Sequence, residues 1–220
     1  MDLSKIILFD GMSGVETDEC CRALGAHEKK YKRGDIIMHA GATAENMGVV
    51  ISGSVTIESV DVWGNCTILS HVGEKGFFAE TYALLNDEVM LVDVRANEDC
   101  RIMFLNMRRL RPEREDAASW QRKLTANLLT ISLHKNLALS RRSFHTAPKT
   151  IRRRLLSYLS GMALKTRKTE FDIPFDRSQL ADYLNVERTA LSKELSKMQR
   201  DGIISFKKNR FKLLDTNEKI

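Results

Sequence analysis

Short apolar runs separated by glycines fill the chain between residues 32 and 105. Glycine readily adopts the positive φ of a tight hairpin turn, so glycines at this spacing indicate turns between strands. The runs that predict strands span residues 35–38, 48–51, 54–60, 66–69, 90–96 and 101–105. Short strands with regular turns are typical of a β-sandwich or a small barrel, which encloses its own side chains or one small ligand.

A long helix is predicted next. No glycine occurs between Gly76 and Gly161, and a helix over residues 116–144 would be roughly 43 Å long at 1.5 Å per residue. It carries two apolar stripes, one of Trp120, Leu124, Leu128 and Ile131 and one of Leu129, Leu133 and Leu137. One stripe can pack on the barrel, and the other needs a partner, most simply the same helix of a second copy. We therefore expect a homodimer, with Leu124 and Ile131 placed at the seam. The alternative is a helix wholly buried in one chain.

The C-terminal third has the pattern of a winged helix-turn-helix. A helix over residues 150–164 and a short alternating segment over 171–175 come first. Asp176, with Gln179 three residues later, predicts a capping box that opens a helix ending at Leu184. After a tight turn, a second helix over residues 187–201 ends at Gly202. Strands over 203–206 and 211–214 flank a basic turn at 207–210, which predicts a wing.

The outward face of the second helix carries the chemistry of DNA recognition. Leu191, Leu195 and Met198 face inward, which leaves polar side chains outward. Arginine donates two hydrogen bonds to guanine, glutamate accepts from the cytosine amino group, and phosphate contacts fix the register. We predict base contacts by the second helix and phosphate contacts by the first helix and the wing. The predicted DNA-binding residues are Arg177, Ser178, Glu187, Arg188, Thr189, Ser192, Lys193 and Lys208.

The two parts of the chain differ in charge. Residues 1–140 contain 16 Lys and Arg against 20 Asp and Glu, and residues 141–220 contain 19 against 9, so the net charges are −4 and +10 within a total of +6. Clustered Lys and Arg displace the counterions of nucleic acid. The charge therefore favours polyanion binding by the C-terminal part, the alternative being a solvated basic surface without a partner.

Other classes of protein are disfavoured by what the 220 residues lack. They contain no run of the ~18 to 20 apolar residues that cross a bilayer and no cleavable leader, so we expect a cytoplasmic protein. The motifs G-x-S-x-G and H-E-x-x-H, the P-loop and the dinucleotide turn are missing, so we expect no enzyme. Cys20, Cys21, Cys66 and Cys100 form no C-x-x-C pair and are expected to be free thiols.

The order of glycine-rich barrel, long helix and winged helix-turn-helix resembles the Crp/Fnr superfamily of bacterial transcription regulators. The resemblance covers about residues 8–214. It rests on the stretches Arg33-Gly34-Asp35-Ile36-Ile37 with Gly41, Val50-Ile51-Ser52-Gly53-Ser54-Val55, Trp63-Gly64-Asn65, Ile68-Leu69-Ser70, Gly76-Phe77-Phe78-Ala79-Glu80, Val94-Arg95-Ala96 and Asp201-Gly202-Ile203-Ile204.

The resemblance implies an α+β fold in three parts. These are an N-terminal cyclic-nucleotide-binding-like β-roll over residues 1–115, a dimerisation helix over 116–145 and a winged helix-turn-helix over 146–220. It also implies transcriptional control by a homodimer on a near-palindromic site in double-stranded DNA, with RNA polymerase as a further partner.

The segment around Glu80 departs from the pattern of cyclic-AMP-binding members of the family. There, Gly-Glu is followed ten residues later by Arg-Ser, and the arginine neutralises the cyclic phosphate. Here Ala79 precedes Glu80, and the later two places hold Met90 and Leu91. An anionic phosphate without a paired charge is costly to bury, and a Cβ at residue 79 crowds the backbone approach. Cyclic AMP is therefore not expected.

Two cofactors of the family are not expected either. Cluster-binding members use a set of N-terminal cysteines, whereas Cys20 and Cys21 are adjacent and cannot easily both reach an iron–sulfur cluster. A haem needs an axial ligand near Glu80, where no His or Cys stands, and His71 is expected to be a surface residue.

We predict instead that the β-roll binds a neutral or aromatic effector. The residues expected to line its pocket are Phe77, Phe78, Ala79, Glu80, Met90 and Leu91. Three alternatives stay open. They are an empty roll that always permits DNA binding, a thiol-redox switch through the cysteines, and a ligand-binding or protein-interaction module without DNA binding.

Overall fold

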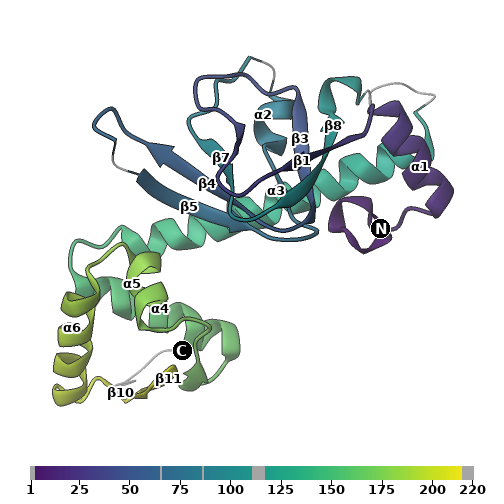
Figure 1. Cartoon of the computed structure of the whole chain (residues 1–220). Coiled ribbons are helices and arrows are strands. Elements are labelled where there is room, and N and C mark those ends of the chain that lie inside the picture. Colours follow the sequence, from purple (N-terminus) through teal and green to yellow (C-terminus); the bar gives the residue numbers. More distant parts are fainter. Residues whose placement is uncertain (1–2, 65, 86, 111–116, 215–220) are drawn as a thin grey trace. The chain divides into compact units, whose positions relative to one another are not determined.

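The computed structural model describes residues 3–64, 66–85, 87–110 and 117–214 (Figure 1). The chain divides into two compact units, Met1–Ile131 and Ser132–Ile220. The predicted boundary between residues 115 and 116 lies outside the described residues, as does Asn65 of the family-like stretch Trp63-Gly64-Asn65. The division of the chain into three parts stays a prediction.

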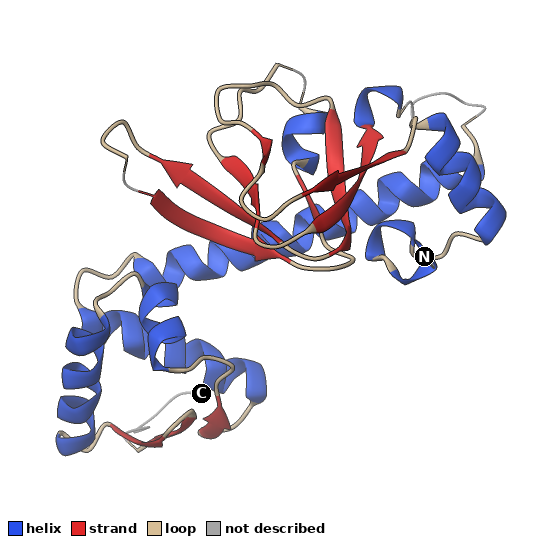
Figure 2. Ribbon diagram, viewed as in Figure 1, coloured by secondary structure: helices blue, strands red, loops and turns tan. Residues whose placement is uncertain are grey.

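Two four-stranded antiparallel sheets form the β-roll of the first unit (Figure 2). The first sheet has the order β1-β8-β3-β6 and the second the order β2-β7-β4-β5. The strands are β1 (His27–Tyr31), β2 (Ile36–Met38), β3 (Asn46–Ser52), β4 (Val55–Val60), β5 (Cys66–Val72), β6 (Phe77–Phe78), β7 (Asp93–Ala96) and β8 (Cys100–Asn106). The β-roll predicted by the family resemblance is confirmed.

Apolar side chains from both sheets fill the interior of the roll. Val50 and Ile102 of the first sheet and Val55 and Val94 of the second belong to one buried cluster. The turn into β4 needs a glycine, because Gly53 has φ +81° and an added Cβ would lie 2.7 Å from the Cβ of Cys100. The glycine-rich pattern therefore reflects close packing as well as turns.

A second core lies on the other face of the first sheet. It contains the short helices η1 (Leu3–Lys5) and η2 (Ile7–Phe9), the helix α1 (Gly14–Ala23) and the first part of α3 (Ser119–Thr146). Polar contacts also hold α3 here: Lys123 Nζ lies 2.7 Å from Glu16 Oε2, and Asn127 Nδ2 donates to the carbonyl of Leu8 at 3.0 Å. A third short helix, η3 (Met107–Arg109), follows β8.

The two stripes of α3 differ in burial. Leu124 and Ile131 are 0% and 7% exposed within the second core, so their predicted place at a dimer seam is wrong. They share the stripe of Trp120 and Leu128, which packs on the chain's own unit. Leu129, Leu133 and Leu137 of the other stripe are 60%, 57% and 50% exposed. Only this second stripe is left for a partner.

The segment before β7 is not the strand that its composition predicts. The helix α2 (Glu80–Leu84) comes first, and residues 90–92 are not part of either β-sheet. Met90 instead exchanges backbone hydrogen bonds with the loop before β3, accepting from Gly41 and donating to Ala42, both at 2.8 Å. The strand predicted over residues 90–96 is therefore shortened to Asp93–Ala96.

The second unit has its own core, which the elements after α3 form. Its elements are α4 (Ile151–Thr166), β9 (Glu170–Asp172), α5 (Arg177–Leu184), α6 (Arg188–Arg200), β10 (Ile204–Lys207) and β11 (Arg210–Leu213). The three strands form a sheet of order β10-β11-β9. Leu155 and Leu159 of α4 pack with Leu184 of α5 and Leu195 of α6. The winged helix-turn-helix is confirmed. None of the described helices is long and apolar enough to span a bilayer.

Candidate nucleic-acid interface

The two helices of the helix-turn-helix begin at well-formed caps. Asp176 Oδ1 accepts from the backbone N–H of Gln179 at 2.8 Å, and Gln179 Oε1 accepts from the N–H of Asp176 at 2.9 Å. This is the capping box that the sequence predicts. Asn185 ends α5 in the left-handed conformation, with φ 52°, which asparagine tolerates better than most residues. Local sequence thus fixes both ends of α5.

Replacing Asp176 by alanine is expected to lower the free energy of unfolding by about 1 kcal/mol, because it leaves the first N–H groups of α5 without an acceptor. Thermal or urea unfolding followed by circular dichroism measures the loss. Asp182→Ala on the same helix is the control. It removes a carboxylate from the last turn, where negative charge opposes the helix dipole, and should cost nothing. Equal losses in the two variants would show that the cap is not the cause.

The helix α6 has one buried and one exposed face. Leu191, Leu195 and Met198 are fully buried, as predicted, whereas Arg188, Thr189 and Lys193 are exposed. Ser192 is half-buried and its hydroxyl donates to the carbonyl of Arg188 at 3.0 Å. Within the described residues the guanidinium of Arg188 has no hydrogen-bond or ion-pair partner. The N-terminal end of α6 therefore presents a cation that is free to bind.

Glu187 caps α6 with both oxygens of its carboxylate. They accept from the backbone N–H groups of Thr189 at 2.7 Å and Ala190 at 2.6 Å. These two hydrogen bonds lower the pKa of Glu187. A contact with a cytosine amino group would have to share these oxygens, and this contact stays a prediction.

Arg177, a predicted phosphate ligand, connects α5 to the wing. Its guanidinium lies 5.1 Å from the ring centroid of Phe206 and donates to the carbonyl of Lys208 at 3.4 Å. Burial lowers the pKa of Arg177. Ser178 beside it is half-buried. The arginine thus holds the wing against α5, and its contact with phosphate stays a prediction.

Two arginines outside the motif bind the turn between α5 and α6. Arg154 Nη1 donates to the carbonyls of Leu184 at 3.1 Å and Asn185 at 2.8 Å. Arg142 Nε and Nη2 donate to the carbonyls of Tyr183 at 3.2 Å and Asp182 at 3.0 Å. These carbonyls lie at the C-terminal end of α5, where a helix leaves acceptors unpaired. The two arginines therefore fix the position from which α6 starts.

A third arginine anchors the body of α6. Arg152 lies 2.6 Å from Glu194 and 2.5 Å from Asp201. The basic run at residues 152–154 looks like a solvated helix face in the sequence, yet two of its three members have structural partners. A single sequence carries no signal for most of them: Arg154 Nε donates to the nearby carbonyl of Pro148 at 2.8 Å, but the other partners of Arg152 and Arg154 lie 30 to 49 residues further along the chain.

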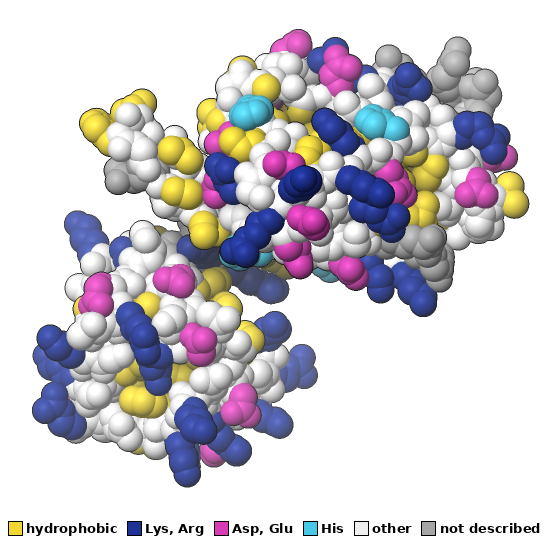
Figure 3. Space-filling view, viewed as in Figure 1, with side chains coloured by type: hydrophobic (Ala, Val, Ile, Leu, Met, Phe, Trp, Pro, Cys, Tyr) yellow, Lys and Arg dark blue, Asp and Glu magenta, His cyan; other side chains and the backbone are white. Residues whose placement is uncertain are grey.

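The wing ends in an exposed basic turn. Lys207 of β10 pairs with Arg210 of β11, and Lys208 between them has φ 54°. Lys208 and Asn209 are exposed. Figure 3 shows dark-blue Lys and Arg side chains around much of the visible surface of this unit, including the side of α6. Exposed cations on both the wing and α6 make this unit suited to a phosphate backbone.

The predicted effector residues are dispersed in the first unit. Phe78 and Met90 are 1% and 2% exposed in the buried cluster inside the roll, and Ala79 packs against the same cluster. Phe77 packs against the second core, on the other face of the sheet. Glu80 is buried at the start of α2, and Leu91 is 74% exposed. The first unit thus brings Phe78, Ala79 and Met90 together and turns Leu91 to the outside.

Ala79 holds a backbone conformation that favours glycine, with φ 60° and ψ 13°. Ala79→Gly is therefore expected to raise the free energy of unfolding by roughly 1 kcal/mol. Ala83→Gly within α2, where the backbone is helical, should instead lower it by about 1 kcal/mol or more. Urea unfolding of both variants measures the two changes, and a loss of stability in Ala79→Gly would contradict the strain at this residue.

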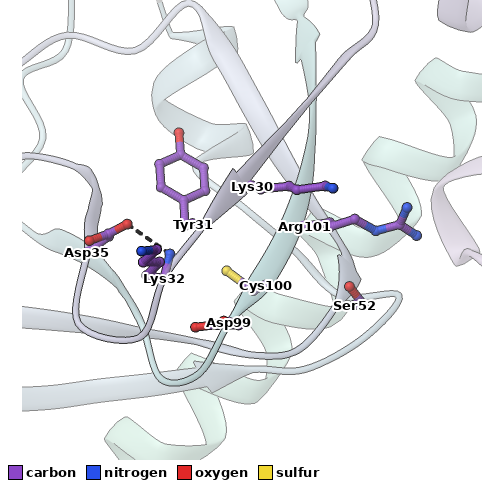
Figure 4. A pocket seen from close by; sticks show the side chains of 8 residues that line it. All are labelled: Lys30, Tyr31, Lys32, Asp35, Ser52, Asp99, Cys100 and Arg101. Atoms are coloured by element: carbon purple, nitrogen blue, oxygen red, sulfur yellow. Dashed lines mark hydrogen bonds between the residues drawn. The ribbon is translucent and has the colours of Figure 1, made fainter.

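A cavity of about 480 Å³ lies at the β1–β8 edge of the roll, away from the predicted effector residues (Figure 4). Lys30 pairs across the strands with Arg101, and Arg101 with Ser52. Figure 4 shows these three on one side of the cavity, with Asp35 and Asp99 on the other. This cavity could not be predicted from the sequence, because the adjacent cations become apparent only when the strand register is known.

The four cysteines are free thiols. Burial raises the pKa of Cys20 to about 12 and raises that of Cys21 and Cys100. Partial burial and the nearby carboxylate of Glu58 raise the pKa of Cys66. Thiols with raised pKa values contain little thiolate near neutral pH and react slowly with oxidants.

In the described part of the chain, no three His, Cys, Asp or Glu side chains are placed to hold a metal ion.

Comparisons with known proteins match both units. The cyclic nucleotide-binding domain family matches residues 28–115, and the Crp-like helix-turn-helix domain family matches residues 153–218. A relative in Pasteurella multocida, the cAMP-activated global transcriptional regulator CRP, is 21% identical over 179 residues, which are 81% of this chain and 86% of the relative.

Two solved structures share the fold. The Catabolite Activator Protein of Thermus thermophilus is 21% identical, with a TM-score of 0.50 over 94% of this chain and 93% of that chain. CprK in complex with OCPA is 15% identical, with a TM-score of 0.61 over 91% of each chain. At these identities the structures establish the similarity of fold alone.

Proposed function

This chain belongs to the Crp/Fnr superfamily of bacterial transcription regulators, and we propose that it binds a specific DNA sequence as a homodimer controlled by an effector other than cyclic AMP. The family consists of regulators and not of enzymes. The proposal rests on the two faces of α6. One face is buried and fixes the helix in the C-terminal unit, while Arg188, Thr189 and Lys193 on the other face stay exposed. A regulator of this kind acts on the chromosome, so we place it in the cytoplasm.

The arrangement of the C-terminal unit supports sequence-specific binding. The N-terminal residues of a recognition helix contact base edges in the major groove. Arg188 is the first residue of α6, and Arg142 and Arg154 hold the turn just before it. The base-reading side chain therefore starts from a fixed backbone, which a specific contact requires.

The exposed stripe of α3 supports the homodimer. Leu129, Leu133 and Leu137 are each at least half exposed, and they recur every four residues along one helix face. A second copy of the same helix can cover all three by an isologous contact. Contact with RNA polymerase stays a prediction.

The interior of the roll supports an effector other than cyclic AMP. No lysine or arginine occurs between Glu80 and Val94. Arg95, which follows, is paired with Glu58 at 2.6 Å and with the carbonyl of Gly34 at 3.0 Å. Met90 is 2% exposed within the core of the roll. A cyclic phosphate would find an apolar side chain in place of a counter-charge.

Fluorescence anisotropy of the full chain with a labelled duplex tests the proposal. We expect binding that weakens steeply with salt, since phosphate neutralisation releases counterions. Lys208→Ala should weaken binding to all duplexes alike.

Calorimetry with cyclic AMP should show no binding. Tight cyclic AMP binding that strengthens DNA binding would contradict the proposed effector class. Absence of DNA binding in every condition would favour an interaction module. Loss of DNA binding on mild oxidation, restored by reductant, would favour a thiol switch.

A further inference from the structure

His145 lies at the joint between α3 and the helices that follow it. It is in the last turn of α3, in the part of that helix that belongs to the second unit. Its ring centroid lies 5.6 Å from that of Tyr158 of α4 and 6.1 Å from that of Tyr183 of α5. Gly161 makes room for the ring, since an added Cβ there would lie 3.0 Å from Cε1 of the histidine. One imidazole thus packs against two helices at the end of α3.

Hydrogen bonds place the proton of the neutral ring on Nδ1. The Ser157 hydroxyl donates to the carbonyl of Phe144 at 3.4 Å, so its oxygen is left to accept from His145 Nδ1 at 3.2 Å. A neutral imidazole carries one N–H, so Nε2 is the nitrogen that takes up a second proton. Nε2 has no hydrogen-bond partner among the described residues, and a Cβ added to Gly161 would lie 3.5 Å from it. A proton taken up at Nε2 therefore finds no acceptor in place.

The charged groups that face His145 are cations. Arg141 of α3 and Lys165 of α4 line the same cavity of about 390 Å³ as the histidine, and none of its described lining residues is acidic. The guanidinium of Arg142 lies on the other side of the α5 tyrosine, 5.9 Å from its ring centroid. Burial raises the pKa values of the two phenols that pack on the imidazole, so they stay uncharged. Residues 174–175, which complete the lining before α5, are uncharged as well.

The surroundings of the ring therefore oppose its protonation. Burial and the nearby Arg141 lower the pKa of His145 below the 6.5 of an ordinary histidine. Because the packed ring binds a proton less readily than an exposed one, packing is at full strength above about pH 6.5 and weakens as the pH falls below this value. The ring is half-buried, so a proton reaches it without unfolding of the unit.

The same face of α3 holds the turn before the recognition helix. Arg142 lies three residues before His145, and residues at this spacing are neighbours on a helix surface. Its guanidinium donates to the carbonyls of Tyr183 at 3.2 Å and Asp182 at 3.0 Å. A displacement of the end of α3 therefore moves this arginine too, and it removes one of the two contacts that fix the start of α6.

We propose that His145 makes this joint sensitive to protons. Uptake of a proton releases the end of α3 from α4 and α5, Arg142 withdraws from the turn, and Arg188 loses its fixed starting position. Specific DNA binding then weakens in acid, while non-specific binding through phosphate contacts is kept. The effect on DNA rests on the proposed function, whereas the release of α3 does not.

NMR of the full chain without DNA tests the joint itself. Histidine ring signals are followed from about pH 8 to about pH 5, and the signal missing from His145→Gln identifies His145. Its midpoint should lie below about 6.5. Amide exchange of residues 140–146, corrected for its intrinsic pH dependence, should speed up in acid in the wild-type protein but not in His145→Gln, which stays uncharged and can still donate to Ser157. His39→Gln, at an exposed histidine of the first unit, should behave as the wild type.

DNA titration tests the coupling to α6. The affinity of the wild-type protein for its specific site should be up to about tenfold weaker at about pH 5.5 than at about pH 7.5, the limit for one proton with an ordinary pKa near 6.5. This factor should be lost in His145→Gln and kept in His39→Gln.

The proposal is overturned if His145 titrates at about 6.5 or above, or if acid speeds up the exchange of residues 140–146 equally in His145→Gln. Release of α3 in acid with no loss of specific DNA binding would overturn the coupling to α6. Absence of DNA binding at every pH would contradict the proposed function, and the NMR result would still decide the joint.

Discussion

Replacing Leu133 and Leu137 together by glutamate is expected to convert the protein to a monomer and to lower its affinity for a palindromic site at least 100-fold, which is the order of magnitude of the gain from linking two binding modules. The two leucines are 57% and 50% exposed on the stripe of α3 that its own unit does not cover. In the proposed dimer this stripe is buried against its copy, and unpaired carboxylates there would be strongly unfavourable. Each monomer would then hold one half-site alone.

Sedimentation and DNA titration of the same samples measure both effects. Leu139→Glu is the control. Leu139 is 68% exposed on α3, but it lies about 120° around the helix from the middle of the stripe. This variant should stay dimeric. A wild-type protein that sediments as a monomer at micromolar concentrations, or a double variant that remains a dimer, would contradict the proposed seam.

Arg188→Ala should lower affinity for the best DNA site by about 1 to 3 kcal/mol, roughly 5- to 150-fold, and relax the preference at one base pair. The reason is the free guanidinium at the start of α6, which can donate two hydrogen bonds to one guanine. Arg188→Lys keeps the charge without the planar donor pair, so it should recover non-specific affinity but not the base preference.

Competition titrations with duplexes that differ at single positions measure this preference. Lys208→Ala is the comparison, since a phosphate contact on the wing should weaken all duplexes by the same factor. If Arg188→Ala left the ranking of the duplexes unchanged, α6 would not be the helix that contacts the bases.

The C-terminal motif could be predicted because its signals are local. Each signal involves residues that are close together in the sequence: the capping box of Asp176 and Gln179, the spacing of Leu191, Leu195 and Met198, and the basic turn of the wing between β10 and β11. Each also agrees with the tertiary structure, as is usual where local preference and packing coincide.

Parts of the first unit could not be predicted in the same way. The strand β1 has the sequence HEKKY, which lacks apolar alternation, and it forms through pairing with β8 more than 60 residues away. The helix α1, which is absent from the elements predicted above, does carry a local signal in the capping box of Ser13 and Glu16. Residues 90–92 have strand composition, yet Met90 bonds to the loop before β3. Long-range backbone pairing decided β1 and residues 90–92.

The candidate interface shows the same division. The exposed position of Arg188 follows from helix periodicity, whereas the roles of Arg142, Arg154 and Arg177 depend on contacts across the fold. A basic side chain has the same appearance in the sequence whether it holds a backbone carbonyl or stays free for phosphate. The structure distinguishes the two by their hydrogen-bond partners.

Selection of bound duplexes from a pool of random sequence tests the central claim most directly. The full-length wild-type protein should enrich a near-palindromic site whose half-sites are about 34 Å apart, one turn of the double helix. Its affinity for that site should exceed its non-specific affinity by at least about 10³-fold. A pool that remains random after repeated selection, although the protein is folded, would contradict the account of this chain as a sequence-specific DNA-binding regulator.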